Sequence, residues 1–419
     1  MRQTAIAFLF CSLVPLCSTA GTAVHHVDCA GGGDYLTIQE AVDAAANGDT
    51  ILVAACVYEE RVSVLGKNVA ILGAGWESTE ITTTEVGFTV SLDERPQGDV
   101  TSRLSDIRVT NTGPLGRCVR IAHLVVALER CRIDDVMQVG DEDPANVDVS
   151  DCVIGELSVG GLGARVSVHD SQVGQLVAGG GYDGTYWWGH AVSASNTIGT
   201  LWVTGGVADS EGDEVELVKY EGHLDCYSTL SAVDGSFGEV RLNGAWDVSL
   251  ERCEMESIVY VPDIESHVSM SGCLVLGDFR TVDEGWYGVP LEATLMHNTI
   301  LGDLSHAVPE CPAHGEVSSN IVVGSVDFSE AEGALFRNND ILGAVAAPGA
   351  TFVDNISEDP LFCDAATGDY TLEDCSPCLG TAHDGGDIGA FGEGCECDVA
   401  VEDTSWGRIK GLFRWGRAP

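Results

Sequence analysis

A pattern of apolar and small residues repeats along most of the chain, and it constrains the fold more than any other feature. Residues 145–159 (ANVDVSDCVIGELSV) and 164–178 (ARVSVHDSQVGQLVA) share one register. Counted from a small or polar anchor residue, apolar side chains recur at positions −5, −3, +2, +5 and +7. The units that follow this pattern have as anchors Cys131, Cys152, Ser171, Asn196, Gly235, Cys253, Cys273, Asn298, Asn320 and Asn339.

The spacing within each unit predicts its backbone. Apolar residues two apart, at −5 and −3 and again at +5 and +7, indicate short β-strands separated by bends. Glycine at +3 or +4, as in Gly155 and Gly277, marks the second bend, where we expect a left-handed backbone. The 39 residues between Asn196 and Gly235 hide either a long insertion or one degenerate unit at about 215–230.

A unit of this length cannot bury its apolar face alone. Identical coils stacked about 4.8 Å apart would form parallel sheets around a continuous apolar interior. The sequence therefore predicts an all-β, single-stranded parallel β-helix, a solenoid of stacked coils.

Both ends of the predicted solenoid resemble known proteins. The opening segment of the right-handed parallel β-helix proteins of the pectin-lyase-like superfamily is similar to residues 33–51 (GDYLTIQEAVDAAANGDTI), 57–60 (VYEE) and 67–73 (KNVAILG). The closing segment of many secreted bacterial β-helix proteins is similar to residues 359–362 (DPLF), 368–372 (GDYTL), 376–377 (SP) and 387–392 (DIGAFG).

The resemblance implies a right-handed solenoid with an N-terminal cap helix at about 37–46. A helical stripe of apolar residues agrees with that helix, at Ile38, Ala41, Val42 and Ala45. We expect one β-helix domain over 24–394, with a closing segment at about 359–394. The resemblance is specific for the fold and implies no particular reaction.

The N-terminal residues are typical of a secretory signal peptide. Arg2 precedes an apolar run at 6–16, and small residues follow up to Ala23. We therefore expect a signal peptide over 1–23 and a protein that is secreted or held at the cell surface. No other segment approaches the roughly 20 apolar residues of a membrane span.

The C-terminal tail over 395–419 differs from the rest in charge. After Asp403 it holds four cations and no acid, at Arg408, Lys410, Arg414 and Arg417. A short amphipathic helix there is a candidate for sorting, surface attachment or docking to a partner. The alternative is a helix that docks on the chain's own acidic surface.

The overall charge restricts the partners. The chain has 65 acidic and 20 basic residues, a formal net charge of −45. Such a field repels phosphate backbones and anionic lipids, which excludes nucleic acid as a partner class. It also disfavours polyanionic substrates such as pectate unless cations intervene.

The number of cysteines in the predicted mature chain favours disulfide bonds. Of the 16 cysteines, Cys11 and Cys17 leave with the signal and 14 remain, an even number in an oxidising compartment. In the related proteins glycine commonly stands where this chain has Cys29 and Cys56, and we predict that these two form a disulfide. In the closing segment we predict a disulfide between Cys363 and Cys378.

Other cysteines leave alternatives open. A zinc site is the alternative for the closely spaced Cys375, Cys378, Cys395 and Cys397. Two pairs occupy equivalent anchors on neighbouring coils and are either small inward side chains or cross-coil disulfides: Cys131 with Cys152, and Cys253 with Cys273.

The catalytic motifs of related enzymes do not assemble in this sequence. Pectinesterases share the opening segment, but their glutamine and aspartate motifs have no match after Gly73. Fragments that resemble polygalacturonase motifs lie many coils apart, at 134–135, 313–315 and 408–410. Pectate-lyase chemistry needs an arginine or lysine base beside carboxylates that hold calcium, and the sequence places no arginine near such a cluster. We therefore expect a non-catalytic protein, with a lyase-type polysaccharide-degrading enzyme and a purely structural surface protein as alternatives.

The longest insertions fall between +7 and the next −5, so we expect them along one edge of the rod. Two of them combine aromatic rings, which stack on sugars, with acids, which accept hydroxyl hydrogen bonds. The predicted ligand-binding residues are Tyr182, Asp183, Tyr186, Trp187, Trp188, His190, Asp283, Glu284, Trp286 and Tyr287. We predict that this edge binds an extracellular glycan or another extended ligand; the alternative is that the aromatic rings pack locally.

No cofactor is required by this interpretation, but an acidic loop offers hard oxygen ligands for Ca²⁺ at Asp141, Glu142 and Asp143. A solvated loop without an ion is the alternative. Asp151 and Asp170 stack as like charges on adjacent coils and are a further candidate cation site. We expect Arg130 to form a cross-coil ion pair with Asp151.

Overall fold

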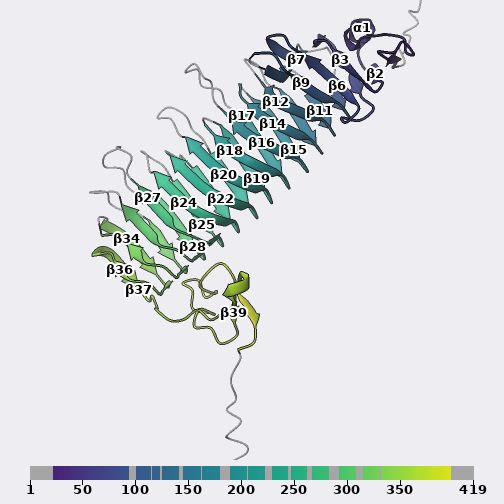
Figure 1. Ribbon diagram of the computed structural model, residues 1–419. Coiled ribbons are helices and arrows are strands. Elements are labelled where there is room, and N and C mark those ends of the chain that lie inside the picture. The colour runs from purple at the N-terminus through teal and green to yellow at the C-terminus, as the bar shows by residue number, and fades with distance from the viewer. Residues whose placement is uncertain are drawn as a thin grey trace, which may run out of the picture.

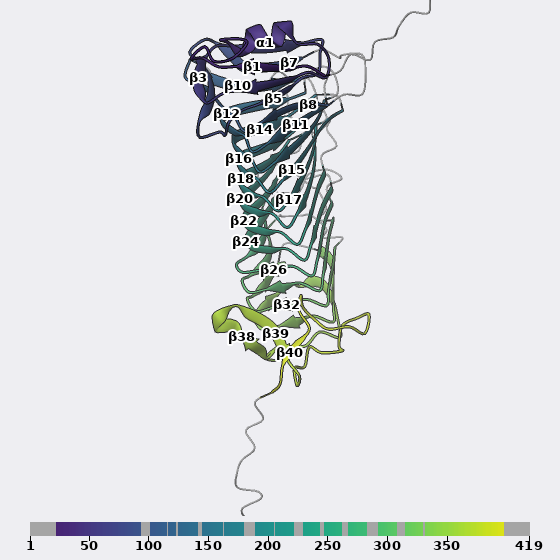
Figure 2. The same cartoon turned by 90° about the vertical axis from the view of Figure 1, so that its right-hand side faces the viewer.

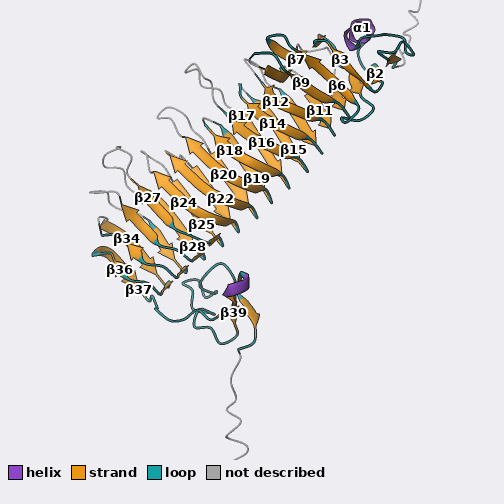
Figure 3. Cartoon of the chain, viewed as in Figure 1, coloured by secondary structure: helices purple, strands orange, loops and turns teal. Residues whose placement is uncertain are grey.

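The structure, a computed structural model, describes residues 22–93, 101–114, 116–122, 125–140, 145–161, 163–179, 189–204, 206–221, 229–243, 247–261, 267–282, 292–307, 315–329 and 332–397. These residues form an elongated solenoid of parallel β-strands with very little helix (Figures 1 and 3). The predicted all-β solenoid is confirmed. Within the described ranges, no helix is long and apolar enough to span a bilayer.

Sheet A has 16 parallel strands that follow one another in chain order. They are β1 (Val24–Val27), β2 (Thr50–Val53), β5 (Ala70–Leu72), β8 (Ser102–Ser105), β11 (Val125–Glu129), β13 (Asn146–Ser150), β15 (Ala164–His169), β17 (Gly189–Ala194), β19 (Val207–Glu211), β21 (Thr229–Val233), β23 (Asp247–Glu251), β25 (His267–Ser271), β28 (Glu292–Met296), β31 (Glu316–Ser318), β34 (Glu332–Arg337) and β37 (Gly349–Val353).

Sheet B has 21 parallel strands and stacks along the same axis (Figure 2). In the middle of the solenoid each coil gives sheet B one long strand that bends, whereas the coils at both ends give two short strands. The strands are β3 (Cys56–Glu59), β4 (Val62–Leu65), β6 (Thr79–Thr83), β7 (Gly87–Asp93), β9 (Arg108–Asn111), β10 (Gly116–Ile121), β12 (Arg132–Val139), β14 (Val153–Val159), β16 (Gln172–Ala178), β18 (Thr197–Val203), β20 (Glu214–Glu221), β22 (Ser236–Asn243), β24 (Glu254–Val261), β26 (Leu274–Val275), β27 (Phe279–Val282), β29 (Thr299–Ile300), β30 (Leu304–Ala307), β32 (Ile321–Val322), β33 (Val326–Asp327), β35 (Asp340–Ile341) and β36 (Val345–Ala346).

The apolar positions of the repeat form the core between the two sheets. In the coil with anchor Cys152, the five template positions are all at most 4% exposed: Val147, Val149, Ile154, Leu157 and Val159. The long gap in the repeat is one degenerate coil, made of β19 and β20 with Asp213 as its buried anchor. Of the two alternatives for this gap, the degenerate unit is therefore the one observed.

The anchors form a ladder of hydrogen bonds at the corner between sheets A and B. The side-chain oxygen of Asn320 accepts from the backbone N–H of Asn298 at 2.9 Å, and Asn339 does the same for Asn320 at 2.9 Å. The residue before each anchor turns the chain in the left-handed region, as at His297 with a φ of 54°. The ladder satisfies backbone N–H groups that the turn would otherwise leave unpaired inside the protein.

Helix α1 (Ile38–Ala44) packs against β1, β2 and β4 at the N-terminal end of the solenoid (Figure 2). Thr37 caps the helix, and the Glu60 carboxylate accepts from the N–H groups of Ile38 and Gln39 at 2.8 and 2.9 Å. The predicted apolar stripe is buried at Ile38, Ala41, Val42 and Ala45.

The closing segment, predicted over 359–394, contains a short 3₁₀ turn (Ala365–Thr367) and sheet C, whose last strand ends at Cys395: β38 (Phe362–Asp364), β39 (Asp369–Glu373) and β40 (Glu393–Cys395). It folds back against the corner of the last coils (Figure 1). There the Asn338 side chain donates to the carbonyl of Thr381 at 3.0 Å, and the Gly389 N–H donates to the carbonyl of Ser319 at 2.8 Å.

Of the two predicted disulfides, one is present and the other is not. Cys29 joins Cys56, as expected, with a Cα–Cα distance of 6.4 Å. The prediction that Cys363 pairs with Cys378 is wrong, because Cys378 is buried among apolar side chains of the closing segment and its Sγ lies 3.2 Å from Asp340 Oδ2. The partner of Cys363 is Cys395.

The remaining cysteine alternatives are also decided. Cys375 joins Cys397, and with Cys363–Cys395 this leaves only Cys378 as a thiol among the four residues of the zinc alternative. The anchor cysteines form no disulfide with any described residue and are buried, so they are small inward side chains: Cys131, Cys152, Cys253 and Cys273.

Candidate functional site

A groove runs along the outer face of sheet B, where each long strand bends. Two adjoining hollows of about 570 and 340 Å³ share Thr197 and Gly199 and so form one groove from β12 to β26. Neighbouring strands lie about 4.8 Å apart, so these eight strands span about 34 Å. The groove therefore has the length of an extended polymer segment.

Glycines at the bends create the groove. A Cβ at Gly199 would lie 2.5 Å from the carbonyl oxygen of Gly174, and one at Gly238 would lie 2.1 Å from that of Glu216. Real Cβ atoms do not approach this closely, so a side chain at these bends would push the coils apart. The floor of the groove is consequently bare backbone at these positions.

This finding corrects the sequence-based reason for the glycines. We expected a left-handed backbone at the second bend, but no positive φ occurs at Gly155, Gly174, Gly199, Gly238, Gly277, Gly302, Gly324 or Gly343. The left-handed residues instead precede the anchors. Glycine is needed at the second bend because the backbone of the preceding coil lies too close for a side chain.

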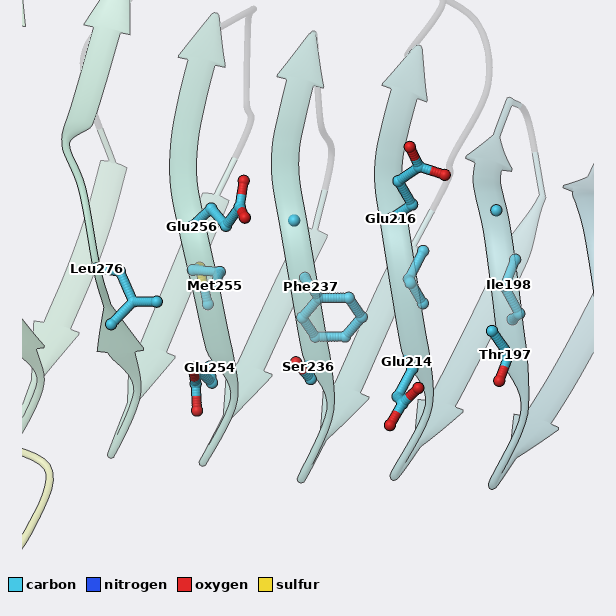
Figure 4. A pocket seen from close by; sticks show the side chains of 13 residues that line it. Thr197, Ile198, Glu214, Glu216, Ser236, Phe237, Glu254, Met255, Glu256 and Leu276 are labelled. Carbon is cyan, nitrogen blue, oxygen red and sulfur yellow. The ribbon is translucent and has the colours of Figure 1, made fainter. Parts of the chain in front are cut away.

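Four exposed glutamates line the C-terminal half of the groove. Glu214 and Glu216 lie on β20, whereas Glu254 and Glu256 lie on β24. Strand β22 runs between them and contributes only Ser236 and Gly238 to the outer surface here, so the two acidic pairs flank an open gap (Figure 4). Carboxylates two strands apart can accept hydrogen bonds from the same extended ligand.

Apolar side chains of the core lie beneath the same half of the groove. Ile198, Phe237 and Met255 line the hollow but are nearly covered, and Phe237 is 4% exposed. Leu276 closes the C-terminal end and is 39% exposed (Figure 4). A ligand here would meet the backbone of the bends, the exposed glutamates and Leu276, a set of groups that offers hydrogen-bond acceptors for hydroxyls and one apolar contact.

Arginines mark the N-terminal end of the groove. The Nε atoms of Arg108 and Arg132 donate to the two carboxylate oxygens of Asp134 at 2.8 and 2.6 Å. The Arg132 guanidinium also lies 5.5 Å from the ring centre of Trp76. Burial raises the pKa of Asp134, but hydrogen bonds from Arg132 and Arg108 outweigh burial and leave the pKa below its usual value.

The arrangement of these arginines could not be predicted from the sequence. The sequence placed no arginine beside a carboxylate cluster, yet the stacking of β9 and β12 brings Arg108 and Arg132 to one aspartate. Arg108 also lies 3.9 Å from Glu80 on β6, one coil earlier. Residues 24 positions apart in sequence become neighbours because they occupy the same register position on adjacent coils.

A carboxyl group with a raised pKa lies next to the glycine floor. Burial raises the pKa of Glu156, the neighbouring carboxylate of Asp135 raises it further, and Arg117 lowers it. Glu156 follows Gly155 directly on β14. A carboxyl group that keeps its proton to higher pH has the property required of a general acid.

One of the sequence-predicted ligand-binding residues lies in the part of the chain that the structure describes. His190 is on β17 in sheet A, and its Nε2 lies 2.7 Å from Asp209 Oδ2 on the next strand. It therefore belongs to the other sheet and does not line the groove. The other predicted residues fall outside the described ranges: Tyr182, Asp183, Tyr186, Trp187, Trp188, Asp283, Glu284, Trp286 and Tyr287, together with the predicted calcium ligands Asp141, Glu142 and Asp143.

The predicted partner of Arg130 is wrong. Arg130 donates from Nε and Nη2 to the two carboxylate oxygens of Asp106, both at 2.7 Å, on the preceding coil. Asp151 lies on the following coil. Arg252 reaches back in the same way to Asp234, so both arginines at this corner pair with the coil before.

Sequence reasoning missed the groove although a signal for it was present. The residue after each anchor faces outward, and in the central coils it is polar at Gln172, Thr197, Glu214, Ser236 and Glu254. This row runs parallel to the row of bend glycines. A recurring exposed polar residue two positions before a recurring glycine was therefore the pattern to search for.

No family model and no curated protein matches the chain significantly. Several solved structures are similar in shape. A pectin methylesterase from carrot is 16% identical with a TM-score of 0.32, and the alignment covers 81% of this chain and 90% of the carrot protein. The catalytic unit of a GH87 α-1,3-glucanase from Streptomyces thermodiastaticus is 14% identical with a TM-score of 0.41, covering 77% of this chain and 65% of the glucanase.

The A-module of a mannuronan C-5 epimerase from Azotobacter vinelandii is 13% identical with a TM-score of 0.32, and the alignment covers 77% of this chain and 94% of the module. At these identities and TM-scores, the activities of the three proteins are not transferred to this chain. Its function has to be argued from its own groove.

Proposed function

We propose that this protein binds an extended, uncharged glycan in the groove along sheet B, without chemical change to the ligand. The observation that carries the proposal is the continuity of the groove from β12 to β26. A site of this length and openness suits a polymer better than a small molecule, which is usually enclosed by its pocket.

The groove repeats polar groups once per coil. Gln172, Thr197 and Ser236 are exposed at one register position and offer hydroxyl and amide groups that both donate and accept hydrogen bonds. Sugar hydroxyls also do both. A polymer lying along the solenoid axis would meet a polar group at this register position on each coil from β16 to β24, spaced about 4.8 Å apart, with Glu214 and Glu254 as the acceptor-only members.

Charge favours a neutral ligand. The four glutamates of the groove and the net charge of −45 would repel a polyanion such as pectate. Carboxylates accept strong hydrogen bonds from hydroxyl groups, so the same residues support a neutral glycan.

We further propose that the protein is exported, with residues 1–23 as signal peptide, and that it acts outside the cell or at its surface. The three disulfides among described residues support an oxidising compartment. Right-handed winding is proposed because parallel crossover connections are almost always right-handed. Helix α1 is proposed to close the first coil.

The looped edge remains part of the proposal. The aromatic and acidic residues at 182–188 and 283–287 follow β16 and β27 in sequence, and we propose that they add contacts to the same ligand. Ca²⁺ at Asp141, Glu142 and Asp143 is proposed as an optional ligand, and the tail at 395–419 as a segment that docks a surface partner.

A groove-blocking variant tests the proposal. We would measure retention of the protein by a panel of insoluble and soluble neutral polysaccharides, with pectate as the anionic comparison. Thr197→Trp places a bulky ring in the middle of the groove, whereas the control Val192→Trp places one on sheet A, where Val192 is 40% exposed. We expect Thr197→Trp to abolish retention and Val192→Trp to preserve it. Equal retention by both variants would contradict binding in the groove.

A second candidate function is an enzyme that cleaves a polysaccharide. The observation that favours it is the raised pKa of Glu156, which directly follows Gly155 of the groove and has Asp135 and Arg117 as charged neighbours. Polysaccharides would be incubated with and without Ca²⁺, and both unsaturated products and new reducing ends measured. Activity that Glu156→Gln abolishes would replace the non-catalytic proposal. The absence of both binding and cleavage would favour a structural surface protein.

A further inference from the structure

Two histidines and an aspartate meet where the closing segment lies against the last coils. His297 follows β28 at the corner of the solenoid, whereas His383 and Asp384 belong to the closing segment. One ligand atom of each residue lies within 4.8 Å of those of the other two. His297 Nε2 and Asp384 Oδ2 are 3.2 Å apart. The cluster therefore joins parts of the chain that are distant in sequence.

Each imidazole ring has a polar partner at Nδ1 that fixes its orientation. The Nδ1 of His297 lies 2.9 Å from the backbone carbonyl of Asp387, and the Nδ1 of His383 lies 2.9 Å from Ser319 Oγ. Histidines that bind metals are usually held in this way, by a hydrogen bond at the nitrogen that does not face the ion. His297 thus leaves Nε2 for a ligand, and His383 does the same when its Nδ1–H donates to Ser319 Oγ.

The contact between His297 and Asp384 needs a cation. A carbonyl oxygen can only accept, so the hydrogen bond to Asp387 requires a hydrogen on His297 Nδ1. In the neutral ring Nε2 then carries a lone pair, and it faces a carboxylate oxygen at 3.2 Å. Two acceptors at this distance repel each other unless a proton or a metal ion lies between them.

The spacing fits a metal ion. Tetrahedral sites with metal–ligand distances of about 2.0–2.1 Å place neighbouring ligand atoms about 3.3 Å apart. The 3.2 Å between His297 Nε2 and Asp384 Oδ2 already matches this value, and His383 needs only a small side-chain adjustment. The His383 and Asp384 side chains are exposed, so an ion can enter from solvent.

The donor set indicates the class of metal. Two imidazole nitrogens and one carboxylate suit zinc and its neighbours in the first transition row, whereas Ca²⁺ and Mg²⁺ prefer oxygen ligands only. We propose that His297, His383 and Asp384 bind one Zn²⁺ ion, with solvent in the remaining position, and that the ion fastens the closing segment to the last coils.

Binding of Zn²⁺ is measured directly on the mature chain at pH 7.5. Equilibrium dialysis followed by metal analysis gives the number of Zn²⁺ ions bound per chain. We expect this number to be higher by one in the wild type than in His297→Gln or Asp384→Asn. Co²⁺ would bind in the same place and give visible absorption bands that both variants lack. Hydrogen exchange of residues 378–390 should slow on addition of Zn²⁺ and return to its former rate with chelator.

Two further variants separate a metal site from an ordinary contact. His190→Gln removes another histidine that faces an aspartate, Asp209 at 2.7 Å, and should leave Zn²⁺ binding unchanged. Ser319→Ala removes the hydrogen bond that orients His383 and should weaken binding about 10–100-fold. Zn²⁺ stoichiometry and hydrogen exchange that are equal in the wild type and His297→Gln would overturn the proposal.

Discussion

Gly238 lies directly against the coil before it, since a Cβ on this residue would be only 2.1 Å from the carbonyl oxygen of Glu216. This contact between Gly238 and Glu216 explains why the outer face of sheet B is hollow at the bend. Adjacent coils approach most closely where side chains are missing, and the polar residues on either side then border an open groove.

Replacing Gly238 by alanine should therefore destabilise the solenoid. The added methyl group must displace backbone rather than a flexible side chain, and overpacking of this kind costs about 1–3 kcal/mol. The free energy of unfolding in urea measures the effect. Ser236→Ala, on the same strand and exposed, should stay within about 0.5 kcal/mol of the wild type. Equal stability of Gly238→Ala and Ser236→Ala would contradict the close approach.

The hydrogen-bond ladder formed by the anchor residues predicts a second loss of stability, with a different cause. Asn320→Ala removes the oxygen that accepts from the Asn298 backbone N–H and leaves that buried group unpaired, at a cost of about 1–3 kcal/mol. Serine at the anchor keeps an acceptor, as Ser171 does for Cys152. We expect Asn320→Ser to lose less stability than Asn320→Ala in urea unfolding. The reverse order would argue against the ladder.

Glu156 and Asp134 should show opposite pH dependence. The pKa of Glu156 is raised from 4.5 by burial and by Asp135, so the folded protein binds this proton more tightly than the unfolded chain. Ionised Glu156 therefore lowers stability as the pH rises through its folded pKa. We expect Glu156→Gln to be more stable than the wild type at pH 7 and equal to it at about pH 3, below both pKa values.

For Asp134 the sign is reversed. Its pKa lies below 3.8 because the hydrogen bonds from Arg132 and Arg108 outweigh burial, so the ionised form stabilises the folded protein above the unfolded pKa. That stabilisation disappears as the pH falls through the folded pKa. Asp134→Asn should therefore be less stable than the wild type at pH 7 in thermal unfolding. A stabilised Asp134→Asn variant would contradict the arginine contacts.

The disulfide pattern is directly testable by peptide mapping under non-reducing conditions. We expect linked peptides that contain Cys29 with Cys56, Cys363 with Cys395, and Cys375 with Cys397. Cys378 should be alkylated only after unfolding, since it is buried. A peptide linking Cys363 to Cys378 would contradict the arrangement of the closing segment.

Much of the fold follows from the periodicity of the sequence. The positions of Val147, Val149, Ile154, Leu157 and Val159 predict two strands and an apolar interior, and the same residues are buried. The coil around Asp213 could be given only as one of two alternatives, because its anchor is a charged residue. Asp213 is nonetheless buried, where its carboxylate accepts from the Asn196 N–H at 2.8 Å and from Ser210 Oγ at 2.6 Å.

The candidate site was harder to predict because it depends on contacts between coils. Nothing in the sequence near Arg108 indicates that Arg132 will lie beside it; only the register of stacked strands does so. Similarly, glycine at a bend is compatible with either a left-handed backbone or a close approach, and Gly199 is there for the second reason. The pairing of Cys363 depends on how the closing segment folds back, which local spacing does not determine.

The most direct test of glycan binding in the groove is the dependence of affinity on ligand length. We would measure the dissociation constants of neutral oligosaccharides of increasing length, from a polysaccharide that retains the wild type, by calorimetry. Affinity should rise with length until the ligand spans the groove, and Thr197→Trp, in its middle, should remove the gain from longer ligands. Affinity that is independent of length, or a length dependence that Thr197→Trp leaves unchanged, would contradict binding along the groove.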